Sequence, residues 1–367
     1  MDFHSQLSIL KNEVEGQIAL FLDTRKDSPV LKGIYEDIKS QVLKGGKRLR
    51  PIVMIQTYAG FKEKDQSILT ASLSCEFVHS ASLILDDAMD EDILRHGEKT
   101  FNAIYADKIF DSMNFSFQKY GRGSSWIQKE GLFDLLYVQR ALSRYSYAMS
   151  SLASNLLYSL SVKCLSEAGF DRQVTLKALT LHNEMFRQLN EGQLLDMFME
   201  KRQCTEQDYL TMIDKKSGLL FAFPMRIASI LAGYDTPALD QYSFPMARGF
   251  QIHDDILGAF GGEETGKPSD SDIKRGKRTL LVIKALKEAA EEQKEMMEAT
   301  LGKADATGEE VDSVRTILRE TKALEYCQEK ARSFTEQAKK GLETIPLKKE
   351  QKVFLEDLAD FVVEREF

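Results

Sequence analysis

The sequence has little of what a strand-and-turn fold or an exported protein requires. It contains only 7 prolines and 22 glycines in 367 residues, which argues against an architecture of many strands and tight turns. Its 4 cysteines stand far apart without a CxxC pair, which argues against a cysteine zinc site and a disulfide framework. The first residues show neither a basic nor an apolar region, so we expect no export signal and a cytoplasmic location.

A basic surplus and an apolar run of membrane length are missing as well. The formal net charge is -8, so nothing in the composition indicates a nucleic-acid-binding face. The longest apolar window that we identify in the sequence covers residues 217–233. It is interrupted by Pro224 and Arg226 and is too short to span a bilayer. We therefore expect no nucleic-acid partner and no integral membrane segment.

What the sequence does contain is helical periodicity, because apolar residues recur at three and four positions in most segments. The predicted helices are 4–25, 31–43, 51–61, 65–92, 132–168, 172–201, 205–234 with a break near Pro224, 237–262, 278–303, 308–344 with a break near Thr321, and 347–365. Two segments, 103–131 and 261–277, are predicted to be non-helical. No linker composition divides the chain, so we expect one domain over residues 1–367 with an insertion at about 103–131.

Aspartates gather at the ends of two of these apolar runs. Asp86 and Asp90 are four residues apart and project from one helix face, whereas Asp87 points about 100° away. Asp254 and Asp255 end a second run. Neighbouring carboxylates repel each other unless a cation is present, and they suit Mg²⁺, which completes its shell with water and substrate phosphate. Each cluster alone is more typical of a solvated helix end, but the two together favour a Mg²⁺ site.

Basic residues suited to a phosphate group accompany these acids along the chain. The stretch GGKRLRP (45–51) places Lys47, Arg48 and Arg50 between a glycine turn and a helix start, a setting that favours an anion. The other candidates share a basic side chain close in sequence to a polar motif: Arg95, His96, Lys216, Lys267 and Lys277. Each of them alone is more typical of a solvated surface charge, and only the combination indicates a site.

Taken in order, the motifs resemble the trans-isoprenyl diphosphate synthase family, and within it short-chain geranylgeranyl diphosphate synthases of the archaeal or bacterial kind. The resemblance covers roughly residues 30–285 and is carried by GGKRLRP, EFVHSASLILDDAMD, RHG, GQLLD, KKSG, GFQIHDDILGAFG and TGKPSDSDIKRGKRTLL. It implies an all-α, isoprenoid synthase-type helical bundle with a central active-site cavity, normally a homodimer. It also implies an enzyme that condenses isopentenyl diphosphate with an allylic diphosphate and releases pyrophosphate.

The resemblance also implies roles for individual residues. The residues expected to hold Mg²⁺, three ions once substrate is bound, are Asp86, Asp90 and Asp254, with Asp87 and Asp255 in support. Those expected to hold the allylic diphosphate are Arg95, Lys216 and Lys267. Those expected to hold isopentenyl diphosphate are Lys47, Arg50 and His79, and His96 and Lys277 are further substrate-binding candidates. The residues expected to line the reacting centre are Gln193, Ser217 and Gln251, beside Lys216.

The sequence differs from the family pattern in four places. His96 stands where an arginine is usual, Ser154-Asn155 replaces a Gly-Asp pair, and residues 103–131 are largely an insertion. Gly258 replaces the last aspartate of the second motif, a variant that resembles archaeal-type members. The first three departures leave open a non-catalytic paralogue that modulates an active synthase. A class I terpene cyclase is a second alternative, because it shares aspartate-rich metal clusters on a helical bundle. GGKRLRP argues against the cyclase, because a cyclase has no use for an isopentenyl diphosphate site.

The helix before Asp86 is predicted to act as a ruler for product length. On a helical wheel its small residues share one flank, which includes Val78, Ala81 and Ser82. In the family, aromatic residues four or five positions before the first aspartate stop growth at farnesyl, and here those positions are Ser82 and Ala81. We expect a product longer than farnesyl, geranylgeranyl first and a twenty-five-carbon chain next. The alternative is that these small residues only allow close helix packing.

Overall fold

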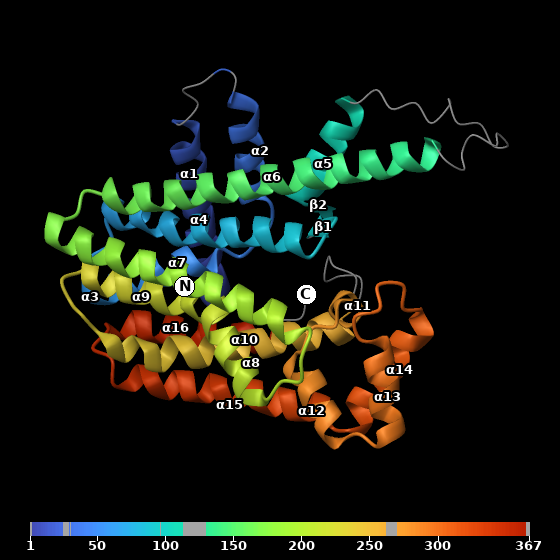
Figure 1. The fold of residues 1–367 in the computed structure, drawn as a ribbon. Coiled ribbons are helices and arrows are strands. Elements are labelled where there is room, and N and C mark those ends of the chain that lie inside the picture. The colour runs from blue at the N-terminus through green and yellow to red at the C-terminus, as the bar shows by residue number, and fades with distance from the viewer. Residues whose placement is uncertain are drawn as a thin grey trace. The chain divides into compact units, whose positions relative to one another are not determined.

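The structure is a computed structural model that describes residues 2–24, 29, 31–95, 97–112, 130–261 and 270–364, without the side chains of 111–112 and 130–142 (Figure 1). The described chain is helical apart from one two-stranded hairpin, so the expected all-α fold class is confirmed. Two compact units are present. Unit 1 comprises Met1–Ile18, Lys47–Glu76 and Ser161–Phe367, and unit 2 comprises Ala19–Gly46 and Phe77–Leu160. The single domain over 1–367 stays a prediction.

The elements divide between the units as follows. Those wholly in unit 1 are α3 (Leu49–Phe61), α7 (Arg172–Met199), α8 (Glu206–Ile213), the π turn η3 (Asp214–Gly218), α9 (Leu219–Leu231), the 3-10 turn η4 (Pro237–Leu239), α10 (Asp240–Phe260), α11 (Ser271–Arg275), α12 (Leu280–Glu288), α13 (Glu291–Thr300), α14 (Gly308–Glu320), α15 (Ala323–Glu343) and α16 (Lys349–Glu364). Those wholly in unit 2 are α2 (Lys32–Leu43), β1 (Leu94–Arg95), β2 (Glu98–Lys99) and α5 (Phe101–Ser112). Three helices belong partly to each unit: α1 (Phe3–Asp23), α4 (Gln66–Met89) and α6 (Glu130–Ser166).

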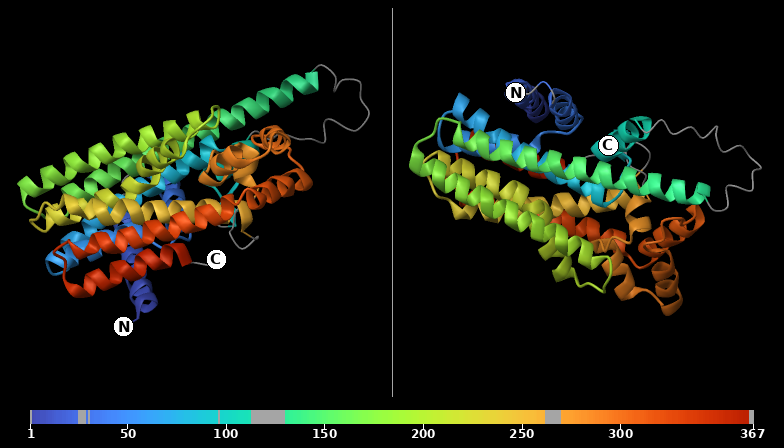
Figure 2. Two further views of the ribbon diagram at one scale, coloured as in Figure 1. Left: turned by 90° about the horizontal axis from the view of Figure 1, so that it is seen from below. Right: turned by 45° about the horizontal axis from the view of Figure 1, so that its top comes forward.

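The packing of unit 1 is organised around α10 and α15, which run side by side (Figure 1). They approach closely at Gly249 of α10, where a Cβ would stand 3.0 Å from the carbonyl oxygen of Ala331 in α15. Helix α16 packs along α15 (Figure 2). Helix α9 packs against both α3 and α7 and is buried over nearly its whole length. These contacts fix the helices that carry the polar motifs of unit 1.

The hairpin of unit 2 was not expected from the sequence. Strands β1 and β2 pair antiparallel, with Leu94 opposite Lys99 and Arg95 opposite Glu98. The turn between them includes Gly97, whose φ of +74° lies in the left-handed region that glycine adopts without strain. Two residues per strand are too few to show the alternation that identifies a strand. The hairpin matters because it positions Arg95.

One predicted helix break was misplaced, and one observed break was not predicted. The break expected near Pro224 lies earlier, at the π turn η3, and Pro224 is inside α9. Proline removes one backbone donor, but α9 is so deeply buried that its packing holds the helix together. The helix predicted at 278–303 divides at Ala289 and Ala290, which both adopt extended backbone conformations.

The segment predicted to be non-helical at 103–131 begins as a helix. Its first residues belong to α5, where the rings of Phe101 and Tyr105 are in contact at a tilt, with centroids 4.8 Å apart, and are both buried. The Tyr105 hydroxyl also donates to Asp37 of α2 at 2.7 Å. This anchoring explains why an aromatic-rich stretch folds here. Residues 113–129 lie outside the described residues.

Helix α4, and not the 217–233 stretch, is long and apolar enough to cross a membrane by length and composition. Among the described residues, α4 is the one helix that meets these criteria, and 72% of its apolar window is buried inside the protein. A buried core helix meets the same criteria, so α4 is weak support for a membrane span. Its burial suits the wall of a packed core.

Candidate active site

Helix α4 ends in three aspartates with different exposure. The backbone N–H of Asp90 donates to the carbonyl oxygen of Asp86 at 2.8 Å, so the helical turn continues and both carboxylates leave from the same side. Both residues are half-buried, whereas Asp87 is fully buried. The chain then turns at Glu91, whose φ of +56° ends the helix. Acids at this end of a helix meet the negative pole of its dipole, so the arrangement is unfavourable without a nearby positive charge.

Arg95 supplies part of that positive charge. Its Nε donates to Asp87 Oδ1 at 2.8 Å, and its Nη2 lies 3.9 Å from Asp86 Oδ2. Burial alone would lower the pKa of Arg95, but the bonds and charges of the aspartates raise it above its usual value. Arg95 therefore stays charged beside Asp86, and its expected contact with an allylic diphosphate stays a prediction. His96 and Lys267, both expected to bind substrate, lie outside the described residues.

The π turn η3 carries Lys216 and Ser217. Wide helical turns of this kind are rare and are frequent at functional sites. Two hydrogen bonds join the turn to α10. Arg248 of α10 donates through Nε to Asp214 Oδ1 at 2.7 Å. The Ser217 hydroxyl donates to Gln251 Oε1 of α10 at 2.7 Å. The turn thus carries two expected catalytic residues next to each other, and Ser217 contacts Gln251. Their role at a reacting centre stays a prediction.

Asp196 of α7 accepts hydrogen bonds from two lysines. Its Oδ2 accepts a bond from Lys216 Nζ at 2.7 Å and from Lys277 Nζ at 2.9 Å. Lys277 also pairs with Glu200 at 2.8 Å. Burial alone would raise the pKa of Asp196, but the two ammonium groups hold it below its usual value. Lys216 and Lys277, 61 positions apart in the chain, therefore share the Asp196 carboxylate as a partner. Gln193 lies half-buried three residues before Asp196 on the same helix.

The second aspartate pair lies near the carboxyl end of α10. Asp254 is half-buried, whereas Asp255 is buried and uses both of its oxygens. Oδ2 of Asp255 accepts from the Tyr209 hydroxyl at 2.7 Å, and Oδ1 accepts from Gln251 Nε2 at 2.9 Å. Burial raises the pKa of Asp255 to about 7, against the opposing effect of the Gln251 bond. Asp255 therefore orients Gln251, and Asp254 is the more accessible carboxylate.

The GGKRLRP stretch separates its cations into different environments. The Lys47 ammonium is at an exposed position 4.7 Å from the ring centroid of Phe361 in α16. The Arg50 guanidinium is half-buried, 5.0 Å from the ring centroid of Phe221 in α9. Burial lowers the pKa of Arg50 to about 10, which still leaves it charged at neutral pH. Arg50 therefore keeps the charge that its expected role requires.

Arg48 has a structural role instead. Its Nη1 donates to Glu76 Oε1 at 2.7 Å, and its Nε donates to Glu15 Oε1 at 3.1 Å. Arg48 and Glu76 are both buried. The backbone of Arg48 has a φ of +53°, which is uncommon for a residue other than glycine. This buried ion pair fixes the loop that carries Lys47 and the start of α3, where Arg50 lies.

The flank of α4 expected to measure product length is closely packed. Val78 and Ala81 are buried, at 0% and 1% exposure. Ser82 is half-buried, and its hydroxyl donates to the carbonyl oxygen of His79 at 2.8 Å. His79 itself is half-buried on the same helix. The small side chains are present as expected, and their role as a ruler stays a prediction.

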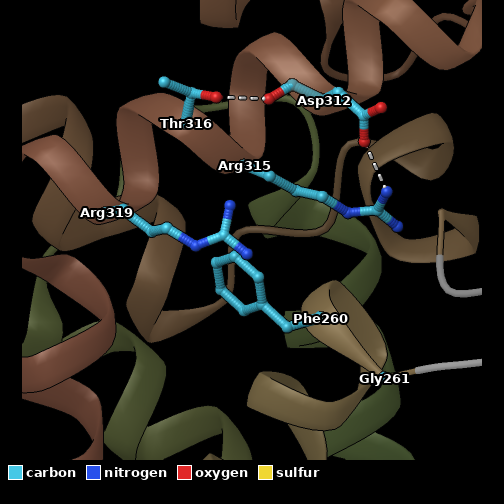
Figure 3. Close-up of a pocket in the computed structure, with 6 residues that line it drawn as sticks. All are labelled: Phe260, Gly261, Asp312, Arg315, Thr316 and Arg319. Carbon is cyan, nitrogen blue, oxygen red and sulfur yellow. Dashed lines mark hydrogen bonds and ion pairs between the residues drawn. The ribbon is translucent and has the colours of Figure 1, made fainter.

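A hollow of about 250 Å³ lies at the carboxyl end of α10 (Figure 3). Arg319 of α14 covers the Phe260 ring at 4.8 Å, and Arg315 donates through Nε to the carbonyl oxygen of Ala259 at 2.8 Å. Arg315 also pairs with Asp312 at 2.7 Å, as Figure 3 shows. The two arginines thus place positive charge at the negative pole of the helix that carries the second aspartate pair.

The carboxylates at the ends of α4 and α10 form a donor set that fits Mg²⁺. Within the described part of the chain, no three His, Cys, Asp or Glu side chains converge closely enough to hold a metal by themselves. Mg²⁺ is usually held by one or two carboxylates together with water and substrate phosphate. Asp86 with Asp90, stacked one turn apart, is a donor set of that kind, and Asp254 is a further carboxylate at the end of α10.

Sequence reasoning assigned no role to two contributors. Asp196 has a detectable signal, since it is an acid in an otherwise apolar helix, yet its bridging of two lysines depends on the fold. Tyr209 has no sequence signal, because a tyrosine in an amphipathic helix is usually a core residue.

The chain has extensive similarity to known proteins. Residues 32–143 and 137–318 match the polyprenyl synthetase family model. The chain is 31% identical over 339 residues to the geranylgeranyl pyrophosphate synthase of Geoglobus acetivorans, covering 91% of this chain and 92% of that protein. It is 29% identical over 332 residues to the geranylfarnesyl diphosphate synthase of Aeropyrum pernix, covering 88% and 91%.

A solved structure shares the fold. The crystal structure of geranylgeranyl pyrophosphate synthase from Corynebacterium glutamicum, complexed with isoprenyl diphosphate and magnesium, matches with a TM-score of 0.85. The match covers 100% of both chains at 24% identity. Likeness at this level of identity shows the fold alone.

Proposed function

Because the chain belongs to the polyprenyl synthetase family and is a polyprenyl diphosphate synthase, we propose that it condenses isopentenyl diphosphate with an allylic diphosphate. The carbon–oxygen bond of the allylic diphosphate breaks and pyrophosphate leaves. The resulting cation forms a carbon–carbon bond with isopentenyl diphosphate, and one proton is lost to the pyrophosphate. The observation that carries the proposal is that an aspartate pair stands near the carboxyl end of both α4 and α10 in a chain of this family.

The roles that we propose follow the polar contacts. Asp86, Asp90 and Asp254 would hold Mg²⁺, three ions with substrate bound, and bound Mg²⁺ neutralises charge on the leaving pyrophosphate. Arg95, Lys216 and Lys267 would bind the allylic diphosphate, with Lys277 as a further candidate. Lys216 and Lys277 are both anchored on Asp196. Fixed donors of this kind stabilise developing charge without having to reorganise during the reaction.

Isopentenyl diphosphate would be bound by Lys47 and Arg50, with His79. Both cations are held in place by aromatic rings, which supports a preorganised anion site. Ser217 and Gln251 would line the reacting centre, since each is fixed by a hydrogen bond to the other. The buried apolar residues around them would exclude water, which would otherwise quench the allylic cation. We further propose that the enzyme acts in the cytoplasm.

The test of this function is an incorporation assay. The purified protein is given Mg²⁺, labelled isopentenyl diphosphate and, in separate reactions, dimethylallyl, geranyl or farnesyl diphosphate, and the products are sized. Label is expected in prenyl diphosphates, and chelation of Mg²⁺ is expected to abolish it. Absence of incorporation with every primer would favour a non-catalytic subunit. A cyclic product formed from a primer alone would favour a terpene cyclase.

We propose geranylgeranyl diphosphate as the main product, because the positions before Asp86 hold no aromatic side chain. Replacing Ala81 with phenylalanine is expected to shorten the product to farnesyl diphosphate, since the ring would extend from the flank of α4 that we assign to the growing chain. The measurement is the chain length of labelled product by chromatography. The product spectra of wild type and variant are compared with the same primer.

The control for the ruler is Leu83→Phe. Residues two apart on a helix lie about 160° from each other, so this ring extends from nearly the opposite side of α4. The control is expected to keep the wild-type product length. If Ala81→Phe and Leu83→Phe give the same distribution as wild type, the small residues serve packing alone.

We also propose that the enzyme is a homodimer. On α7, large apolar side chains are 43–61% exposed: Leu176, Leu194, Met197 and Phe198. Such side chains are typical of a surface that a second copy covers. The mass by light scattering is expected to be twice the 41.7 kDa of one chain. A mass of one chain at micromolar concentration would contradict this assembly.

A further inference from the structure

The β1–β2 hairpin of unit 2 is too short to hold its own position. Each of its strands has only two residues. An isolated two-stranded hairpin is marginally stable at best in water. The hairpin nevertheless carries Arg95, whose guanidinium bonds to Asp87 and lies 3.9 Å from Asp86. Contacts from outside the two strands must therefore keep Arg95 beside the first aspartate motif.

The base of the hairpin is closed by Thr100, which follows β2 and is fully buried. Its backbone N–H donates to the carbonyl oxygen of Ile93 at 3.0 Å, and its hydroxyl donates to the carbonyl oxygen of Asp92 at 2.6 Å. The chain then enters α5 (Figure 1). Both hydrogen bonds stay within residues 92–100, so they shape the hairpin but do not join it to another helix.

Lys44 makes that connection from the end of α2. Its backbone N–H donates to the carbonyl oxygen of Ser40 at 3.0 Å and so ends the helix. Its Nζ donates to the backbone carbonyl oxygen of Lys99 at 3.0 Å and lies 3.2 Å from Oε2 of Glu98. One ammonium group, on a side chain only 21% exposed, thus contacts both residues of β2.

The two contacts of Lys44 differ in what they contribute. The side chain of Glu98 is 62% exposed, and exposed ion pairs contribute little to stability. The bond to the Lys99 carbonyl oxygen has a charged donor, which makes it stronger than a bond between neutral groups. It also acts on the backbone of β2, which pairs with the strand that carries Arg95. The carbonyl contact is therefore the one that fixes the hairpin.

Helix α2 also holds the segment that follows the hairpin. Asp37 of α2 accepts a hydrogen bond from the Tyr105 hydroxyl of α5 at 2.7 Å and pairs with Lys108 of α5. Lys44 and Asp37 thus connect α2 to residues 94–112 at two separate points. Because α5 is anchored independently, losing the Lys44 contact would displace the hairpin without releasing the whole segment.

We propose that Lys44 is a positioning residue for the allylic diphosphate, because it holds β2 at the end of α2 and so sets the place of Arg95. This inference rests on the proposed function, in which Arg95 binds the allylic diphosphate. The place of Lys44 in the chain, three residues before Lys47, would favour isopentenyl diphosphate. Its contacts with β2 assign it to the other substrate.

The test measures the two substrates separately in the full-length protein. Binding of farnesyl S-thiolodiphosphate, an allylic analogue that ionises too slowly to react, is measured with Mg²⁺ by isothermal titration calorimetry. The Michaelis constants for farnesyl diphosphate and isopentenyl diphosphate are the second readout. The variants are Lys44→Met, Arg95→Gln and the double variant that combines them.

Two further variants are matched controls. Lys39→Met removes another lysine of α2, which is 25% exposed and pairs with Asp23 at 2.7 Å instead of with the hairpin. Glu98→Gln removes the exposed ion pair of Lys44 and keeps the bond to the Lys99 carbonyl oxygen. Both controls are expected to match wild type in the two readouts.

Lys44→Met is expected to weaken binding of the analogue about tenfold, because small displacements of a positioning group have effects of this order or larger. The Michaelis constant for farnesyl diphosphate is expected to rise equally, and that for isopentenyl diphosphate is expected to stay unchanged. In the Arg95→Gln background the same substitution is expected to have no further effect, since the residue through which Lys44 acts is gone.

Three results would overturn the inference while leaving the proposed function intact. The first is wild-type binding of the analogue in Lys44→Met. The second is a rise for isopentenyl diphosphate as large as that for farnesyl diphosphate, and the third is an undiminished effect of Lys44→Met in the Arg95→Gln background. A wild-type protein that does not bind the analogue with Mg²⁺ would instead contradict the proposed function itself.

Discussion

Replacing Gly192 with alanine is expected to lower the rate of condensation about 10²-fold, because small displacements of catalytic groups have effects of this size. Gly192 of α7 lies against the π turn η3. A Cβ there would stand 2.5 Å from the backbone nitrogen of Lys216 and 2.7 Å from the carbonyl carbon of Lys215. Backbone atoms cannot rotate away, so the turn that presents Lys216 and Ser217 has to move.

Overpacking of this kind also destabilises the fold, typically by about 1–3 kcal/mol. The measurements are kcat with saturating substrates and the free energy of unfolding in urea. The matched control is Gly16→Ala, since Gly16 lies inside α1 and an added Cβ would meet nothing within 4 Å. Alanine there is expected to stabilise the helix by up to about 1 kcal/mol and to leave kcat unchanged. A Gly192→Ala enzyme with wild-type kcat would show that the π turn has no part in catalysis.

Replacing Arg48 with methionine is expected to destabilise unit 1 by about 3–5 kcal/mol, because it leaves a buried carboxylate without its partner. Arg48 and Glu76 are 5% and 3% exposed, and their ion pair is 2.7 Å long. Screening by solvent is therefore weak at this pair, unlike at surface pairs, which contribute little. The measurement is the free energy of unfolding in urea.

The double variant Arg48→Met/Glu76→Leu separates the ion pair from other effects of the substitution. Replacing both partners removes the unpaired charge, so the double variant is expected to be more stable than Arg48→Met alone. The surface pair Lys64–Glu13 is a suitable comparison, and Lys64→Met is expected to change the stability by less than about 1 kcal/mol. Equal losses in Arg48→Met and Lys64→Met would contradict the assigned role of Arg48.

The helices of this protein could be predicted well from its sequence, because helical periodicity is a local property. The break near Thr321 was found, and α14 does end at Glu320 with Lys322 in a left-handed conformation. The π turn η3 was missed for a physical reason. Its geometry depends on Arg248 and Gln251 of α10 and on the close approach of Gly192, which are contacts between segments far apart in the chain.

The motifs of the candidate site were found in the sequence, but their arrangement was not. The spacing of Asp86 and Asp90 correctly placed both on one face of α4. The spacing of basic residues grouped Arg48 with Arg50, and only the family resemblance left Arg48 out of the substrate-binding residues. In the structure Arg48 is committed to a buried ion pair, whereas Arg50 packs on Phe221. Nor did the sequence show that Lys44 bonds to the backbone of β2. Such differences arise only when the helices pack.

The central claim is that this chain transfers an allylic group to isopentenyl diphosphate, and its stoichiometry is the most direct measurement. With farnesyl diphosphate, labelled isopentenyl diphosphate and Mg²⁺, we expect one pyrophosphate released for each isoprene unit incorporated, with geranylgeranyl diphosphate as the main product. Asp86→Asn/Asp90→Asn is expected to abolish both release and incorporation. Pyrophosphate released from farnesyl diphosphate without incorporation of label would contradict the account.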